Sequence, residues 1–141
     1  MPIFPSVEWF EAVRQTVNGS REFRALGNCD ATVGVKVGGK AYRLKFEAFS
    51  CEGASEIGVD GLGDTDFYLE MSPGEWREML GNIRANGGAD GEHSLNTLDM
   101  SREGGILRAK DGLLRQSFFR HHLSVQAYFD ASAQVETVFA A

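Results

Sequence analysis

The sequence contains little cysteine, and its two cysteines are not spaced like metal ligands. Cys29 and Cys51 form no CxxC pair, and no further ligand lies at the spacing of a zinc site. A chain of 141 residues can bury a core without covalent crosslinks. We therefore predict two free thiols, no bound metal and a reducing, cytoplasmic location.

Long apolar runs are also absent. No segment approaches the roughly 18 consecutive apolar residues of a membrane-spanning helix. The segment Met1–Ser6 lacks the basic and apolar regions of a secretory signal. These absences predict a protein without stable membrane insertion and without a leader peptide.

Basic residues are outnumbered, with 14 lysines and arginines against 20 aspartates and glutamates, which gives a net charge of −6. Nucleic acids and anionic membranes are recognised through basic surfaces. The sequence therefore predicts no nucleic-acid partner.

Local catalytic motifs are missing as well. The sequence has no GxSxG, P-loop, GxGxxG or HExxH pattern. The adjacent His121 and His122 point about 100° apart on a helix, so they are poorly placed to share a metal. Segment Asp60–Asp66 lacks the terminal glutamate of a calcium loop and is typical of a turn. We predict no catalytic residue and no cofactor.

The clearest pattern that is present surrounds Gly38 and Gly39. Apolar residues alternate with polar ones over residues 31–37 and again over residues 42–48. This alternation predicts an antiparallel hairpin with one apolar face and one wet face. Further strands are predicted at 57–59, 66–71 and 106–107.

Helical spacing recurs in three segments. Ser6 is a typical N-cap for a helix over residues 7–18, and residues 20–24 add one turn. Ser72 and Glu75 form a capping box for a helix that ends near Asn86. A long final helix is predicted from about Asp111 to about Ala131. Because no linker or repeat interrupts the chain, we predict one α+β domain over residues 1–141.

The final helix carries an apolar stripe next to two histidines. The stripe comprises Leu114, Phe118, Val125 and Phe129, and it is widened by Phe119 and Leu123. His121 and His122 flank it, either as histidines packed against the backbone or as polar anchors at the edge of an apolar pocket.

Two segments carry a family resemblance. The strand-to-helix segment Asp66–Trp76 and the segment Gly105–Asp111 before a terminal helix resemble the sterol carrier protein 2-like family of lipid-binding domains. The resemblance implies a mixed sheet of about five strands backed by helices. It also implies a hydrophobic tunnel between sheet and helices for lipid transport. The ligand would be a fatty acyl chain, an acyl-CoA or a sterol, and no catalytic residue is carried over.

Candidate lining residues follow from this hypothesis, although each also fits a plain core position. They are Phe46, Leu69, Met79, Leu80, Phe118, Phe119, His122 and Phe129. Binding would rest on apolar surface leaving water, at about 25 cal/mol per Å².

Two alternatives remain open. One is a small cone-like enzyme of the ketosteroid-isomerase-like (NTF2-like) kind, with a buried aspartate or histidine as general base; Asp66 and His122 are the residues to test. The other is an interaction domain that forms a homodimer through the phenylalanine-rich final helix.

Overall fold

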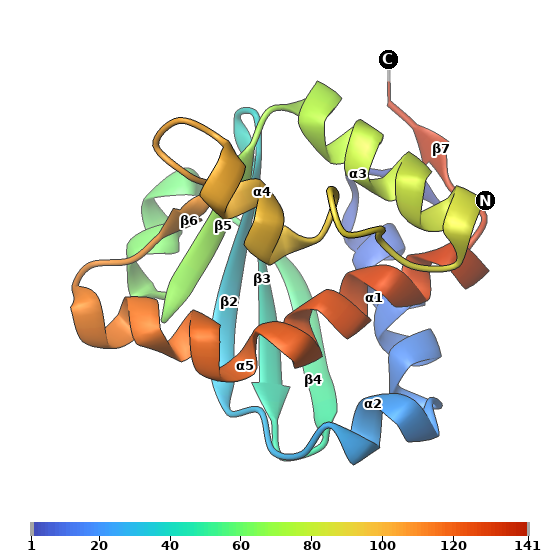
Figure 1. Cartoon of the computed structure of the whole chain (residues 1–141), viewed down its shortest axis with the longest axis horizontal. Coiled ribbons are helices and arrows are strands. Elements are labelled where there is room, and N and C mark those ends of the chain that lie inside the picture. The colour runs from blue at the N-terminus through green and yellow to red at the C-terminus, as the bar shows by residue number, and fades with distance from the viewer. Residues whose placement is uncertain (1, 141) are drawn as a thin grey trace.

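A five-stranded sheet in the order β4-β3-β2-β5-β6 lies at the centre of the computed structural model, which describes residues 2–140 (Figure 1). Its strands are β2 (Ala31–Val37), β3 (Lys40–Glu47), β4 (Ser50–Ile57), β5 (Phe67–Met71) and β6 (Leu107–Arg108). β2 and β5 are parallel and the other neighbours are antiparallel. This mixed sheet and the helices confirm the predicted α+β class and the predicted hairpin.

Five α-helices accompany the sheet within the described residues. They are α1 (Val7–Asn18), α2 (Arg21–Ala25), α3 (Pro73–Asn86), α4 (Leu95–Ser101) and α5 (Gly112–Asp130). The predicted caps are present: the Ser6 side chain accepts from the Trp9 amide, and Ser72 and Glu75 form the capping box of α3. None of these helices is long and apolar enough to cross a membrane.

One face of the sheet packs against the helices, and α5 crosses in front of it in Figure 1. Phe67, Leu69 and Met71 of β5 are all buried and point to this face. Both tryptophans are fully buried here; the Trp76 indole N–H donates to the Lys36 carbonyl at 2.9 Å. The core between sheet and helices is therefore rich in aromatic side chains.

The opposite face is covered only in part. The 3-10 helix η1 (Val59–Asp64) places Leu62 against β2. A Cβ atom added to Gly34 would lie 2.7 Å from Leu62 Cδ2 and 2.6 Å from Tyr68 Cβ. Gly34 thus permits the close approach of η1 to the sheet.

The strand predicted at 57–59 is wrong in its bounds. The observed strand β4 begins at Ser50 and ends at Ile57, whereas Val59 begins η1. β4 lies at the edge of the sheet and carries glycine, alanine and serine near its middle, so its sequence shows no apolar alternation.

A side chain of α1 covers part of this sheet edge. The Asn18 Nδ2 group donates to the Cys51 carbonyl at 2.9 Å, and the Cys51 amide donates to Asn18 Oδ1 at 2.8 Å. The amide side chain thus pairs with the backbone of β4 as a neighbouring strand would.

A second, two-stranded sheet joins the two ends of the described chain. β1 (Ile3–Phe4) pairs in parallel with β7 (Val138–Phe139), which follows the 3-10 helix η2 (Ala131–Gln134). These strands are not predicted from the sequence, because a two-residue strand has no measurable period.

Candidate functional site

The predicted ligand-lining residues fall into two groups. The residues buried in the core between sheet and helices are Phe46, Leu69, Met79, Leu80, Phe118 and Phe129. The other two, Phe119 and His122, lie on α5 nearer the surface. The structure therefore brings most of the predicted set together in the core, where their role in ligand binding stays a prediction.

The predicted width of the α5 stripe is wrong. Phe118, Val125 and Phe129 face the core, but Phe119 and Leu123 are 46% and 60% exposed. One turn of helix covers 3.6 residues, so residues 119 and 123 lie to one side of the buried line. Those two side chains are available to line a surface site.

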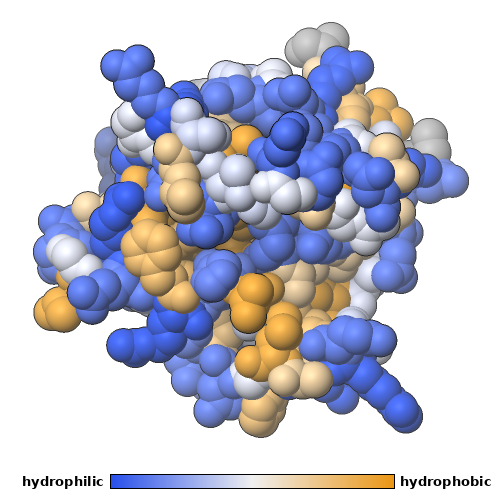
Figure 2. All heavy atoms as spheres, viewed as in Figure 1, coloured by the Kyte–Doolittle hydropathy of each residue, from blue (hydrophilic) through white to orange (hydrophobic). Residues whose placement is uncertain are grey.

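An apolar groove of about 450 Å³ lies where α1, α2 and α5 meet. We call it the α1–α2–α5 groove; its apolar lining is Val17, Phe23, Leu26, Leu123, Ala127 and Ala131. Figure 2 shows orange apolar side chains gathered between α5 and α2, and Leu26 and Leu123 are both exposed. The volume lies within the roughly 300–1,000 Å³ of small-molecule sites.

The polar lining of the groove bears no positive charge. The charged side chains in it are Glu22 and Asp130, and neither lysine nor arginine lines the groove within the described residues. Asp130 already accepts hydrogen bonds from the Gln126 side chain and the Ala89 amide. Uncharged hydroxyl or ester groups suit this rim better than a carboxylate or a phosphate does.

The floor of the groove continues into the core. Phe23 is buried at the floor, and its ring centroid lies 6.4 Å from that of Phe46. Phe46 in turn lies 5.8 Å from Tyr128, whose hydroxyl donates to the Phe10 carbonyl at 2.7 Å. A chain of aromatic rings thus connects the surface groove with one of the predicted lining residues.

Sequence reasoning missed the α1 and α2 side of this groove. Val17, Phe23 and Leu26 lie in or next to short helical segments, far along the chain from Leu123. Only Leu26, an apolar residue after the last turn of a short polar helix, gave a local signal. The groove itself depends on how α5 crosses the first two helices.

The carboxylates and histidines considered for catalysis make structural contacts. Asp66 accepts from the Thr32 amide at 2.9 Å, and the ring nitrogen Nδ1 of His122 lies 2.9 Å from the Phe119 carbonyl. Burial lowers the pKa of His121, and Arg120 lowers it further. The enzyme hypothesis stays a prediction, and these contacts do not add to it.

The two cysteines are free and buried. Burial raises the pKa of each thiol to about 12, so the reactive thiolate is scarce at neutral pH. In the described part of the chain no three histidine, cysteine or acidic side chains are grouped as metal ligands would be.

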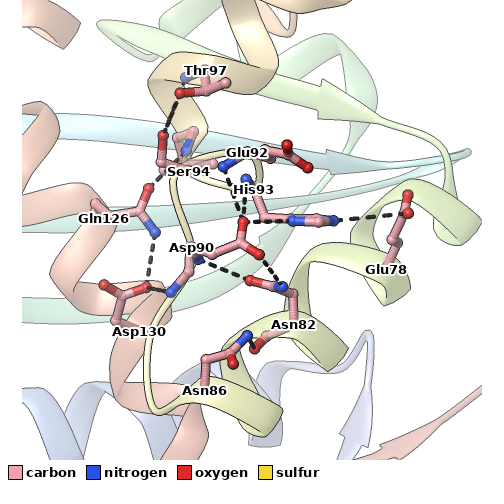
Figure 3. Close-up of polar contacts among 12 residues, drawn as sticks. Glu78, Asn82, Asn86, Asp90, Glu92, His93, Ser94, Thr97, Gln126 and Asp130 are labelled. Carbon is pink, nitrogen blue, oxygen red and sulfur yellow. Dashed lines mark hydrogen bonds and ion pairs between the residues drawn. The ribbon is translucent and has the colours of Figure 1, made fainter.

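A cluster of polar side chains holds the loop between α3 and α4 against α3 (Figure 3). Asp90 exchanges two hydrogen bonds with the Asn82 side chain and lies 2.8 Å from His93 Nδ1. The other ring nitrogen of His93 lies 3.8 Å from the Glu78 carboxylate. The hydrogen bond to Asp90 raises the pKa of His93, and the His93 hydrogen bond is the main cause that lowers the pKa of Asp90 to about 2.

We expect this cluster to make the loop sensitive to pH. The stabilisation of the fold by protonated His93 is fully present below pH 6.5, the ordinary histidine pKa. It is lost as the pH rises through the higher pKa of His93 in the folded state. The stabilisation of the fold by ionised Asp90 is present above pH 3.8, the ordinary pKa, and is lost as the pH falls through the folded-state pKa of about 2. Asp90→Asn should therefore lower the pKa of His93, which an NMR titration of the imidazole protons measures.

Glu92→Gln is the matched control for this titration. Among the acidic neighbours that raise the pKa of His93, Glu92 has the smallest effect. Its effect on the His93 pKa should be smaller than that of Asp90→Asn. Equal effects of the two variants would contradict the direct Asp90–His93 contact.

Comparison of the chain with protein-family models, curated proteins and solved structures finds no match.

Proposed function

We propose that this protein is a binding or carrier domain for an apolar ligand with an uncharged polar end, and that it is a sterol carrier protein 2-like domain. The observation that carries the proposal is the α1–α2–α5 groove, whose floor residue Phe23 packs on Phe46 in the core. The mixed five-stranded sheet backed by helices agrees with the fold that the family resemblance implies.

Apolar burial supplies the affinity in this proposal. Groove residues such as Leu26 and Leu123 expose apolar surface that a ligand would remove from water. At about 25 cal/mol per Å², burial of about 200 Å² of apolar surface contributes about 5 kcal/mol before the costs of association. The ligand would enter at the exposed α5 side and extend toward Phe23.

The negative charge at the rim of the groove favours some ligand classes over others. Glu22 and Asp130 would repel the carboxylate of a free fatty acid and the phosphates of an acyl-CoA. A sterol, or a fatty acyl chain esterified to a neutral group, avoids that repulsion. We therefore place the sterol and the neutral acyl ester ahead of the acyl-CoA.

The test is binding of a fluorescent sterol and of a neutral monoacylglycerol to the purified protein. Leu123→Asp puts a charge into the groove mouth at an exposed position, so we expect at least about tenfold weaker binding with the fold retained. Leu113→Asp is the matched control, because Leu113 lies on the same helix, is 80% exposed and does not line the groove.

The outcomes are distinct. Selective loss in Leu123→Asp supports the proposal, and native mass spectrometry of freshly purified protein should then show a co-purified neutral lipid. If neither probe binds to the unchanged protein and no lipid co-purifies with it, the carrier proposal is wrong. If Leu123→Asp and Leu113→Asp weakened probe binding equally, the ligand site would not be the α1–α2–α5 groove.

A further inference from the structure

A second groove, at the opposite end of α1 from the first, has the opposite charge. It lies beside the β1–β7 pair and measures about 390 Å³. We call it the β1–β7 groove; its apolar walls include Phe4, Pro5, Val37, Pro73 and Phe139. It shares no lining residue with the α1–α2–α5 groove.

Both charged side chains that line this groove are cations. They are Lys40, at the start of β3, and Arg77, on the first turns of α3. Neither forms a salt bridge within residues 2–140. Two cations that have no ion-pair partner among the described residues thus line one apolar groove, in a chain whose net charge is −6. This local reversal of charge is the feature that calls for an anionic occupant.

The placement of Arg77 favours a carboxylate. Its guanidinium carbon lies 5.2 Å from the centre of the Phe139 ring, so the aromatic face restrains the side chain at the groove wall. A planar guanidinium matches a carboxylate through two parallel hydrogen bonds. Lys40 supplies a second positive charge to the same groove.

We propose that the β1–β7 groove binds a single amphiphilic monocarboxylate, with the carboxylate at Lys40 and Arg77 and the apolar body against Phe4 and Phe139. The site takes one molecule rather than an anionic membrane surface, because the groove is concave and the net charge of the protein repels such a surface. This inference is independent of the neutral ligand proposed for the α1–α2–α5 groove.

Tryptophan fluorescence should report on this groove through Phe4, because neither tryptophan lines the groove itself. Phe4 lines it, and its ring centroid lies 4.7 Å from Trp9 and 6.3 Å from Trp76. Titration of the full chain with decanoate, kept monomeric, should change the fluorescence saturably. Decyltrimethylammonium, which has the same chain and the opposite charge, should bind at least about tenfold more weakly.

Two variants test the site. The double change Lys40→Gln with Arg77→Gln should weaken decanoate binding at least about tenfold. Gly74→Phe should also weaken it by filling the groove; Gly74 lines the groove, and an added Cβ meets only Ser72 Oγ at 3.9 Å. Arg43→Gln with Lys45→Gln, on the wet face of β3, is the matched control and should bind decanoate normally.

Unchanged decanoate affinity in both groove variants, with circular dichroism showing that they fold, would overturn the inference. So would equal binding of the cationic probe, or an interaction seen only with anionic phosphatidylserine vesicles. Loss of decanoate binding in Leu123→Asp alone would place the carboxylate in the α1–α2–α5 groove; that result overturns this inference and leaves an apolar-ligand function standing. If the Lys40 and Arg77 double variant loses decanoate binding but still binds the neutral probes, the two ligands occupy different grooves, as we propose.

Discussion

Trp76→Ala should lower the free energy of unfolding by about 3–5 kcal/mol, the cost typical of removing a large aromatic side chain from a core. Trp76 is fully buried on α3, and its ring centroid lies 5.3 Å from that of Phe129 on α5. Its indole N–H also donates to the Lys36 carbonyl of β2. The side chain therefore joins both helices to the sheet, and urea denaturation measures the loss.

Trp76→Phe separates the two roles of this side chain. The phenyl ring keeps much of the packing but removes the hydrogen bond to Lys36, so we expect a smaller loss of about 1–2 kcal/mol. If the alanine variant lost no more stability than the phenylalanine variant, packing of Trp76 between the helices and the sheet would not be its main contribution.

Asp99→Ala should lower the free energy of unfolding by about 3 kcal/mol. The Asp99 side chain, buried in α4, accepts hydrogen bonds from the amides of Ile106 and Leu107 at 2.8 and 3.0 Å. Each buried amide that loses its acceptor costs about 1–3 kcal/mol. Chemical denaturation gives the total effect, and hydrogen exchange should show faster exchange of these two amides.

Two control variants assign this loss to the amides. Asp99→Asn retains an oxygen acceptor and should cost less than Asp99→Ala. Arg115→Gln removes the ion pair to Asp99, whose atoms lie 3.3 Å apart, but Arg115 is half exposed, so the loss should stay below about 1 kcal/mol. A larger effect of Arg115→Gln than of Asp99→Ala would contradict the assignment.

Segments with many residues of one period were predictable from the sequence. The alternation over residues 31–37 and the capping box at Ser72 each depend on local chemistry, and the structure confirms both. β1 and β7 hold only two residues each, too few to show a period. α4 is not among the predicted helices, because it is short and is held by tertiary contacts such as those of Asp99.

The candidate sites were less predictable than the fold. The identity of core residues such as Phe46 and Phe118 follows from their spacing, and both are buried as that spacing suggests. The grooves instead arise where distant segments meet. Phe23 of α2 and Leu123 of α5 line one groove, and Lys40 of β3 and Arg77 of α3 line the other. A single sequence contains no local pattern for such encounters.

The pairing of Asn18 with Cys51 has a consequence for how copies of this protein meet. An uncovered edge strand is a template on which another chain can add its own strand. At β4 the Asn18 amide already occupies the backbone groups of Cys51, and Glu52 and Glu56 place negative charge along the same strand. A second copy would have to break both hydrogen bonds and bring like charges together. This edge therefore resists the growth of the sheet into fibrils.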